Sequence, residues 1–147
     1  MNTVKQKGSA TVEFAMLLPL LLLLVFTVSE FGVMFYRYNA LTKSVDIAAR
    51  YLSGAEEGYP NTPTHETEAK NLAVYGKITA GTAILPDFTP ANIAITNPDA
   101  QHVQVIATYN ANLILGGTLT AFMQYIGGSA ATDFMTLNAA SVMRFAQ

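Results

Sequence analysis

Residues 14–29 read FAMLLPLLLLLVFTVS, a run of 16 residues that has seven leucines, one proline and no charged side chain. Glu13 and Glu30 flank this run, and the next charged residue is Arg37. As an α-helix, the 23 residues between Glu13 and Arg37 would extend about 35 Å, enough to cross the ~30 Å hydrocarbon core of a bilayer. The run therefore predicts one membrane-spanning helix in place of a buried core helix.

Two interpretations of this helix are open. In a secretory signal peptide, Lys5 and Lys7 would form the basic region, and cleavage would follow Ser29. In a retained anchor, the helix would continue into the bulky, largely apolar residues that follow Ser29. Only a few residues precede the span, which favours an amino terminus in the cytoplasm.

The composition of the whole 147-residue chain excludes several function classes. Charged residues make up 12% and the net charge is −2, so the chain lacks the basic field that holds nucleic acid. The absence of cysteine excludes disulfides, cysteine zinc sites and thiol nucleophiles. His65 and His102 do not belong to a cluster with metal-ligand spacing. We therefore expect no catalytic residue, no metal site and no cofactor, and we expect that the chain is not an enzyme.

A short motif precedes the apolar run. Residues 7–14 read KGSATVEF, so that Gly8 is followed five residues later by Glu13 and then by Phe14. In a helix Glu13 would share a face with Ser9, four residues earlier. A carboxylate driven to mid-membrane costs about 2.5 kcal/mol or more, which makes Glu13 a functional candidate. The alternative is an interfacial charge that is favoured near the helix amino terminus.

The basic leader, Gly8 and Glu13 together resemble the class III leader of type IV pilins and pseudopilins, and the Glu13–Phe14 pair resembles the tight-adherence (Tad/Flp) branch. From Gly8 to Ser53 the sequence is similar to the TadE-like domain. The matching pieces are VEFA at 12–15, Pro19, EFG at 30–32, the Ala40–Leu41 pair and AARY at 48–51.

The resemblance implies that a prepilin peptidase cuts between Gly8 and Ser9 and leaves the apolar span attached to the mature chain. Ser9 would become residue one and Glu13 residue five. The Glu13 carboxylate would then neutralise the new α-amine of Ser9 or the amine of a neighbouring subunit during assembly.

The sequence predicts an α+β fold with a pilin-like layout. We expect a leader at 1–8, a transmembrane and spine helix at 9–53, and an exported head at 54–147 that contains short helices and an antiparallel sheet. The helix should run from about Ala10 to Leu52, about 65 Å, with a kink or local break at Pro19. Its second half carries an apolar face of Tyr38, Leu41, Val45, Ala48, Ala49 and Leu52.

In the head, Thr64 is the expected N-cap of a helix that ends near Ile78. Its inward residues should be Ala69, Leu72, Ala73 and Gly76. Alternation of apolar and polar residues predicts strands at 93–96, 102–110 and 137–145. Between the last two strands, Leu119, Phe122, Met123 and Ile126 have the spacing of a helix stripe, within an expected helix at 118–126. This stripe either covers the sheet or contacts a partner.

These features predict a minor pseudopilin that primes or supports assembly of a Tad/Flp-type adhesion pilus. The expected partners are a prepilin peptidase, other minor pseudopilins, the major pilin, the pilus assembly platform and the lipid bilayer. We expect a single-pass protein of the bacterial cytoplasmic (inner) membrane, either retained there or incorporated in the pilus. Two other functions stay open: a membrane-anchored or secreted binding module, and a pseudopilin of a type II secretion system.

Overall fold

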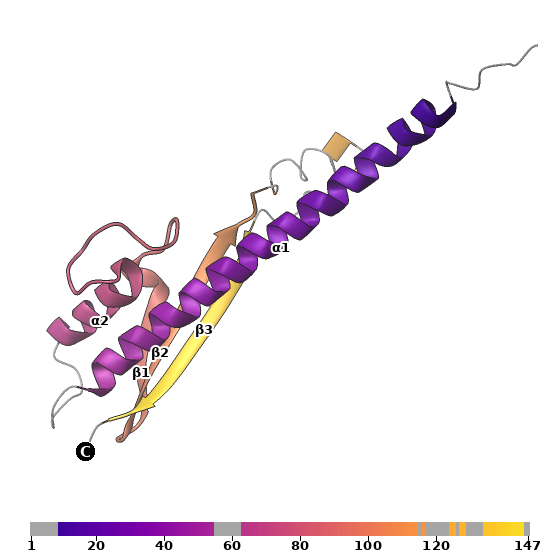
Figure 1. Ribbon diagram of the computed structural model, residues 1–147. Helices are drawn as coiled ribbons and strands as arrows, with labels where there is room; N and C mark the ends of the chain where they lie inside the picture. The colour runs from indigo at the N-terminus through magenta and orange to yellow at the C-terminus, as the bar shows by residue number, and fades with distance from the viewer. Residues whose placement is uncertain are drawn as a thin grey trace, which may run out of the picture.

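The computed structural model describes residues 9–54, 63–114, 116, 124–125, 127–128 and 134–145. The helices are α1 (Ser9–Ser53), α2 (Pro63–Tyr75) and the short 3-10 helix η1 (Pro90–Asn92). The strands are β1 (Ile93–Asp99), β2 (His102–Asn112) and β3 (Phe134–Arg144). Figure 1 shows α1 projecting far beyond the sheet that packs against its carboxyl half. This layout confirms the predicted α+β fold, with a long amino-terminal helix before a short helix and an antiparallel sheet.

Helix α1 is one continuous element of 45 residues, and the expectation of a local break at Pro19 is wrong. Proline has no N–H to donate to the carbonyl oxygen of Ala15, so one hydrogen bond of the helix is missing there. The neighbouring leucines keep their own backbone bonds, and the helix continues through this position. The amino-terminal and carboxyl-terminal halves of α1 therefore form a single rod (Figure 1).

The carboxyl half of α1 supplies one side of the hydrophobic core. Leu41, Val45, Ala48, Ala49 and Leu52 are buried, as the helical spacing predicts. Tyr38 was expected on the same face, but 45% of its surface is exposed. Met34 and Leu41, about one turn before and one turn after Tyr38, are buried instead.

Helix α2 packs against α1 and buries Ala69, Ala73 and Val74. It begins at Pro63, so Thr64 lies inside the first turn and is not the N-cap. It ends at Tyr75, three residues before the expected end. Gly76 adopts a φ of 69°, its N–H donates to the carbonyl oxygen of Leu72 at 2.9 Å, and the residue is exposed.

A side-chain hydrogen bond joins the two helices. The hydroxyl of Tyr51 on α1 donates to Glu68 Oε2 on α2 at 2.5 Å. This hydrogen bond, with a smaller effect of burial, raises the pKa of the Tyr51 phenol above its usual value. The bond holds α2 beside the carboxyl end of α1.

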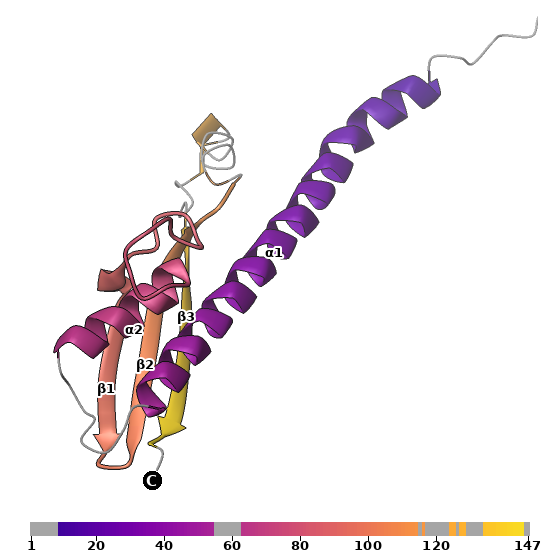
Figure 2. The ribbon, with the colours of Figure 1, turned by 60° about the vertical axis from the view of Figure 1, so that its left-hand side comes forward.

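The sheet is antiparallel, with the strand order β1-β2-β3. Strand β2 is central: Ala107 pairs with Ile93 of β1 on one side and with Ala139 of β3 on the other. The alternation predicted for β2 is confirmed, because Val103, Val105, Ala107 and Tyr109 are buried. Helix α1 packs against β2 and β3, and Figure 2 shows both α1 and α2 beside the sheet.

Strands β1 and β3 also lie where the alternation predicted strands. Both are longer than expected, since β1 continues to Asp99 and β3 begins at Phe134. On β3, Ala139 and Ser141 alternate with exposed neighbours. The expected helix at 118–126 lies almost entirely outside the described residues.

Candidate functional site

The residues of the processing motif lie at the free end of α1. Ser9 is the first residue of the helix, while Gly8 lies outside the described residues. Glu13 follows Ser9 by one turn and is exposed, and Phe14 is 58% exposed. This end of α1 is far along the rod from the sheet (Figure 1).

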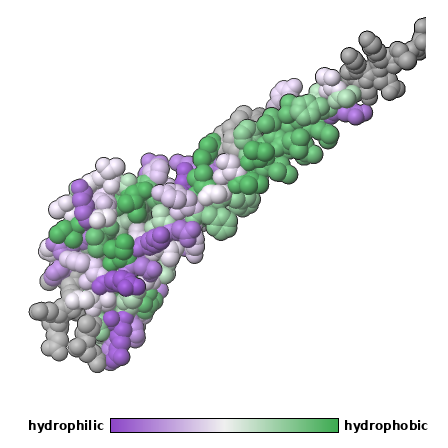
Figure 3. Space-filling model, in the orientation of Figure 1, coloured by the Kyte–Doolittle hydropathy of each residue, from purple (hydrophilic) through white to green (hydrophobic). Residues whose placement is uncertain are grey.

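The amino-terminal half of α1 is not buried by the rest of the described chain. Every residue from Ala10 to Ser29 is exposed. In the space-filling view, apolar side chains cover this projecting half, whereas the visible face of the head is mixed in character (Figure 3). Among the described residues, α1 is the one helix that is long and apolar enough to cross a membrane. An exposed surface of this size and composition indicates a membrane anchor.

Where the apolar half of α1 meets the sheet, two charged side chains bind the end of β2. Glu30 Oε1 accepts a hydrogen bond from the backbone N–H of Ile114 at 2.8 Å. Seven residues later, Arg37 Nη1 donates to the backbone carbonyl oxygen of Asn112 at 2.5 Å. Met34 lies between them and is 6% exposed. We call this set of five residues the junction.

The junction gives Glu30 and Arg37 a structural role that sequence reasoning missed. Residues seven apart in a helix lie on one face, so both side chains reach the same strand. Hydrogen bonds that involve a charged group are about twice as strong as neutral ones. The signal in the sequence was Glu30 itself, since it is the one acidic residue between Glu13 and Arg37.

Tyr109 lies on β2 close to the junction. Its hydroxyl donates to the carbonyl oxygen of Pro86 at 2.8 Å, and its ring meets that of Phe88 edge to face. Burial raises the pKa of the Tyr109 phenol, and the nearby Arg37 guanidinium opposes this effect. These contacts fix the part of β2 that leads into the junction.

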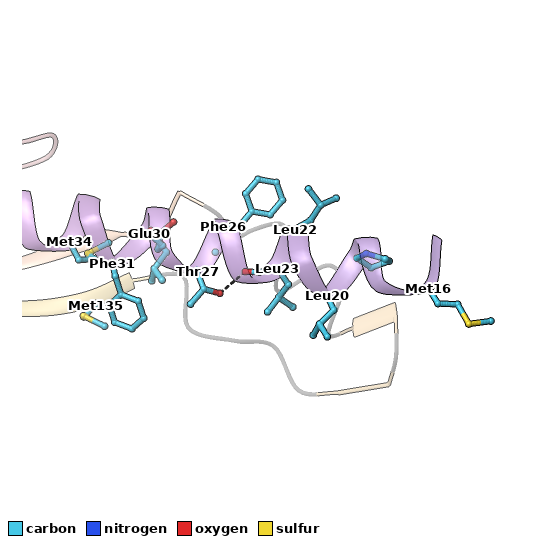
Figure 4. A pocket seen from close by; sticks show the side chains of 13 residues that line it. Met16, Leu20, Leu22, Leu23, Phe26, Thr27, Glu30, Phe31, Met34 and Met135 are labelled. Carbon is cyan, nitrogen blue, oxygen red and sulfur yellow. Dashed lines mark hydrogen bonds between the residues drawn. The ribbon is translucent and has the colours of Figure 1, made fainter. Parts of the chain in front are cut away.

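An apolar groove of about 750 Å³ runs along α1 from the junction toward its amino terminus (Figure 4). Leu113, Gly116 and Met135 line it from the head. The lining residues of α1 are Met16, Pro19, Leu20, Leu22, Leu23, Phe26, Thr27, Glu30, Phe31 and Met34. The groove is thus almost wholly apolar and belongs to both the helix and the head.

The proposed contact residues Leu119, Phe122, Met123 and Ile126 lie outside the described residues. Within the described part of the chain, no three His, Cys, Asp or Glu side chains are grouped so that they could hold a metal ion. His102 Nδ1 lies 2.8 Å from Asp99 Oδ1 in the β1–β2 turn. This pair and a backbone bond from Gln101 lower the pKa of the Asp99 carboxyl.

Residues 8–50 match the TadE-like protein family. The match covers 43 of the 147 residues and confirms the resemblance over that segment. Neither the curated proteins nor the solved structures compared with the chain gave a match.

The TadE-like segment covers the apolar half of α1 and most of its buried half. It contains Ser9, Glu13, Glu30 and Arg37, and therefore both the motif at the free end and the α1 side of the junction. The partners of the junction, Asn112 and Ile114, lie outside the TadE-like segment.

The junction can be tested at the amide of Ile114. In Glu30→Ala this N–H loses its acceptor, and a hydrogen bond to a charged group contributes about 1.5–3 kcal/mol. Its hydrogen exchange should therefore be about 10-fold faster or more, since 1.4 kcal/mol corresponds to a factor of ten. Exchange is measured on the full-length chain in lipid nanodiscs.

Glu30→Gln is the matched control, because its side-chain oxygen can still accept the bond and should preserve most of the protection. The amide of Val105 in central β2 should exchange equally in all three proteins. Equal exchange at Ile114 in Glu30→Ala and the unchanged chain would contradict the role of Glu30.

Proposed function

We propose that this chain is a minor pseudopilin that primes or supports assembly of a Tad/Flp-type adhesion pilus after a prepilin peptidase removes residues 1–8. The observation that carries the proposal is the TadE-like match, which begins at Gly8, directly before the first residue of α1. A peptidase that cuts there would release the mature chain with its membrane-spanning helix intact.

The proposed cut is a hydrolysis of the Gly8–Ser9 amide bond. Water supplies the oxygen of a new carboxylate on Gly8, and the nitrogen of Ser9 becomes a free α-amine that is protonated at neutral pH. The start of α1 would then carry a positive charge close to hydrocarbon, where an isolated ion is costly.

Glu13 is the proposed partner of this charge. It follows Ser9 by four residues on α1, a spacing that brings two positions to the same face of a helix. The carboxylate would pair with its own α-amine or with the amine of a neighbouring subunit. The second pairing would draw the chain into a growing fibre, because an ion pair is stronger in low dielectric than in water.

The orientation follows from the site of processing. A peptidase at the cytoplasmic face of the inner membrane requires Ser9 on that side. Helix α1 would then cross the membrane, and residues 54–147 would form the exported head. The proposed partners are the peptidase, other minor pseudopilins, the major pilin, the assembly platform and the lipid bilayer, with adhesion and biofilm formation as the processes served.

The assembly role of Glu13 predicts a selective defect. Glu13→Gln removes the charge with little change in shape, so the chain should still insert and still lose residues 1–8. The α-amine of Ser9 would have no countercharge, and the number of pili per cell should fall to the level of a deletion strain. Glu13→Asp, which retains the charge, is the control and should restore pili in part.

Electron microscopy counts the pili, and immunoblotting of membranes measures chain level and trimming. Normal piliation in Glu13→Gln would reduce Glu13 to an interfacial charge with no part in assembly.

A minor role predicts a low copy number in the fibre. The head adds a three-stranded sheet and α2 to the helix, which is bulky for close repetition along a thin shaft. Deletion of the chain should abolish or reduce pili, while sheared pili contain far less of it than of the main subunit. Quantitative mass spectrometry measures the ratio, and a near-equimolar amount would overturn the minor role.

A further inference from the structure

The membrane boundary on the head side can be located along α1. The hydrocarbon core takes about 20 residues of helix, and counted from Phe14 this length ends near Val33. Glu30 therefore lies about one helical turn inside the boundary. Tyr36 lies just beyond the boundary and is 69% exposed, and tyrosine is a residue that is enriched at membrane–water interfaces.

The junction brings the chain after β2 to this boundary. Because the Ile114 amide is bonded to Glu30, the β2–β3 connection leaves the strand at that depth. Ile114 is 63% exposed, and Met135, where the chain returns on β3, is 45% exposed. In Figures 1 and 2 the described piece at 124–125 extends beyond the sheet in the same direction as the apolar half of α1.

The two ends of the sheet differ in charge. The end away from the membrane boundary carries Asp99, His102 and Arg144. At the other end, the 20 residues 113–132 contain no charged side chain, and Asp133 is the first acidic residue after them. An uncharged segment of this length is more typical of a membrane or protein contact than of a surface in water.

We propose that Leu113, Ile114, Tyr125 and Met135 form a second membrane-contact surface of the head, with lipid acyl chains as its occupant. The proposal rests on the membrane span of α1, and the surface is continuous with that span through the groove shared by Leu113, Met135 and α1. Tyr125 is 88% exposed, which leaves its ring available to the bilayer.

Leu113 and Ile114 lie near the head-side membrane boundary because the Ile114 amide is bonded to Glu30, whereas the piece at 124–125 lies farther toward the bilayer centre (Figures 1 and 2). Irregular backbone exposed to lipid is excluded from the hydrocarbon centre because its polar groups need partners. Three such groups have partners here. The Ile114 N–H donates to Glu30 Oε1. The Gly116 N–H donates to the carbonyl oxygen of Leu113 at 3.3 Å, and the Gly127 N–H donates to the carbonyl oxygen of Gln124 at 3.1 Å.

A second contact changes how the head sits on the membrane. A single helix leaves the head free to rotate about the helix axis. A surface on one side of that axis stops the rotation, and so it would present α2 and the sheet to other proteins in one fixed orientation. The junction would transmit this restraint from the connection to α1.

The chain contains no tryptophan, so one introduced tryptophan reports its own depth. Tyr125→Trp and Ile114→Trp are placed separately in the full chain and reconstituted in phosphatidylcholine vesicles whose acyl chains carry bromine near the headgroup. Phe26→Trp in the span is the positive control. Ile78→Trp, 49% exposed after α2, is the control in water.

In brominated vesicles, both test variants and Phe26→Trp should lose most of the fluorescence that they show in vesicles without bromine. The fluorescence of Ile78→Trp should be the same in both kinds of vesicle. Bromine placed near the chain ends should quench Phe26→Trp more than Ile114→Trp, since Ile114 is bonded to Glu30 near the membrane boundary. If Tyr125→Trp does not fold, quenching of Ile114→Trp still supports the surface.

The proposal is overturned if both test variants are as unquenched as Ile78→Trp while Phe26→Trp is quenched. That result would mean that water or another protein covers this surface. Absence of quenching in Phe26→Trp would instead contradict the membrane span itself, so the two failures can be told apart.

Discussion

One continuous helix must satisfy two environments, and the remainder of the structure depends on this constraint. Residues 14–29 of α1 expose an uncharged apolar surface, while Leu41, Val45, Ala48 and Leu52 are buried beside the sheet and α2. Burial of the leucine and valine side chains contributes about 1.5–3 kcal/mol each. The side chains of residues 14–29 gain the equivalent free energy when they enter the hydrocarbon of a bilayer. One helix therefore joins the membrane anchor to the core of the head.

The junction lies where the two environments meet. There Glu30 and Arg37 hold the end of β2 against α1 through backbone groups, and Met34 is buried between them. Backbone partners suit this position because the carbonyl oxygen of Asn112, the last residue of β2, and the N–H of Ile114 just after it would otherwise lack these bonds next to an apolar surface. The same bonds fix the position of the connection that we propose contacts lipid.

Local patterns in the sequence predicted α1, β2 and the β3 region, because burial on one face leaves a period of 3.6 or 2 residues. The junction left no such period: its bonds join positions 84 and 75 residues apart, so Glu30 stood out only as an isolated charge. Periodicity also extended α2 past Gly76, where a positive φ ends the helix. The motif around Glu13 was identified from the spacing of Gly8, Glu13 and Phe14. Its proposed role is in cleavage and assembly of the chain, so the fold does not test it.

The central claim is that the mature chain begins at Ser9 and keeps its membrane-spanning helix. The intact mass of the protein purified from membranes of a host with its cognate peptidase tests this claim most directly. The account predicts a chain that lacks residues 1–8 and stays with the membrane fraction. A chain that lacks residues 1–29 and is released would identify a secreted module, and a full-length chain in those membranes would identify a plain anchor; either mass would contradict the account.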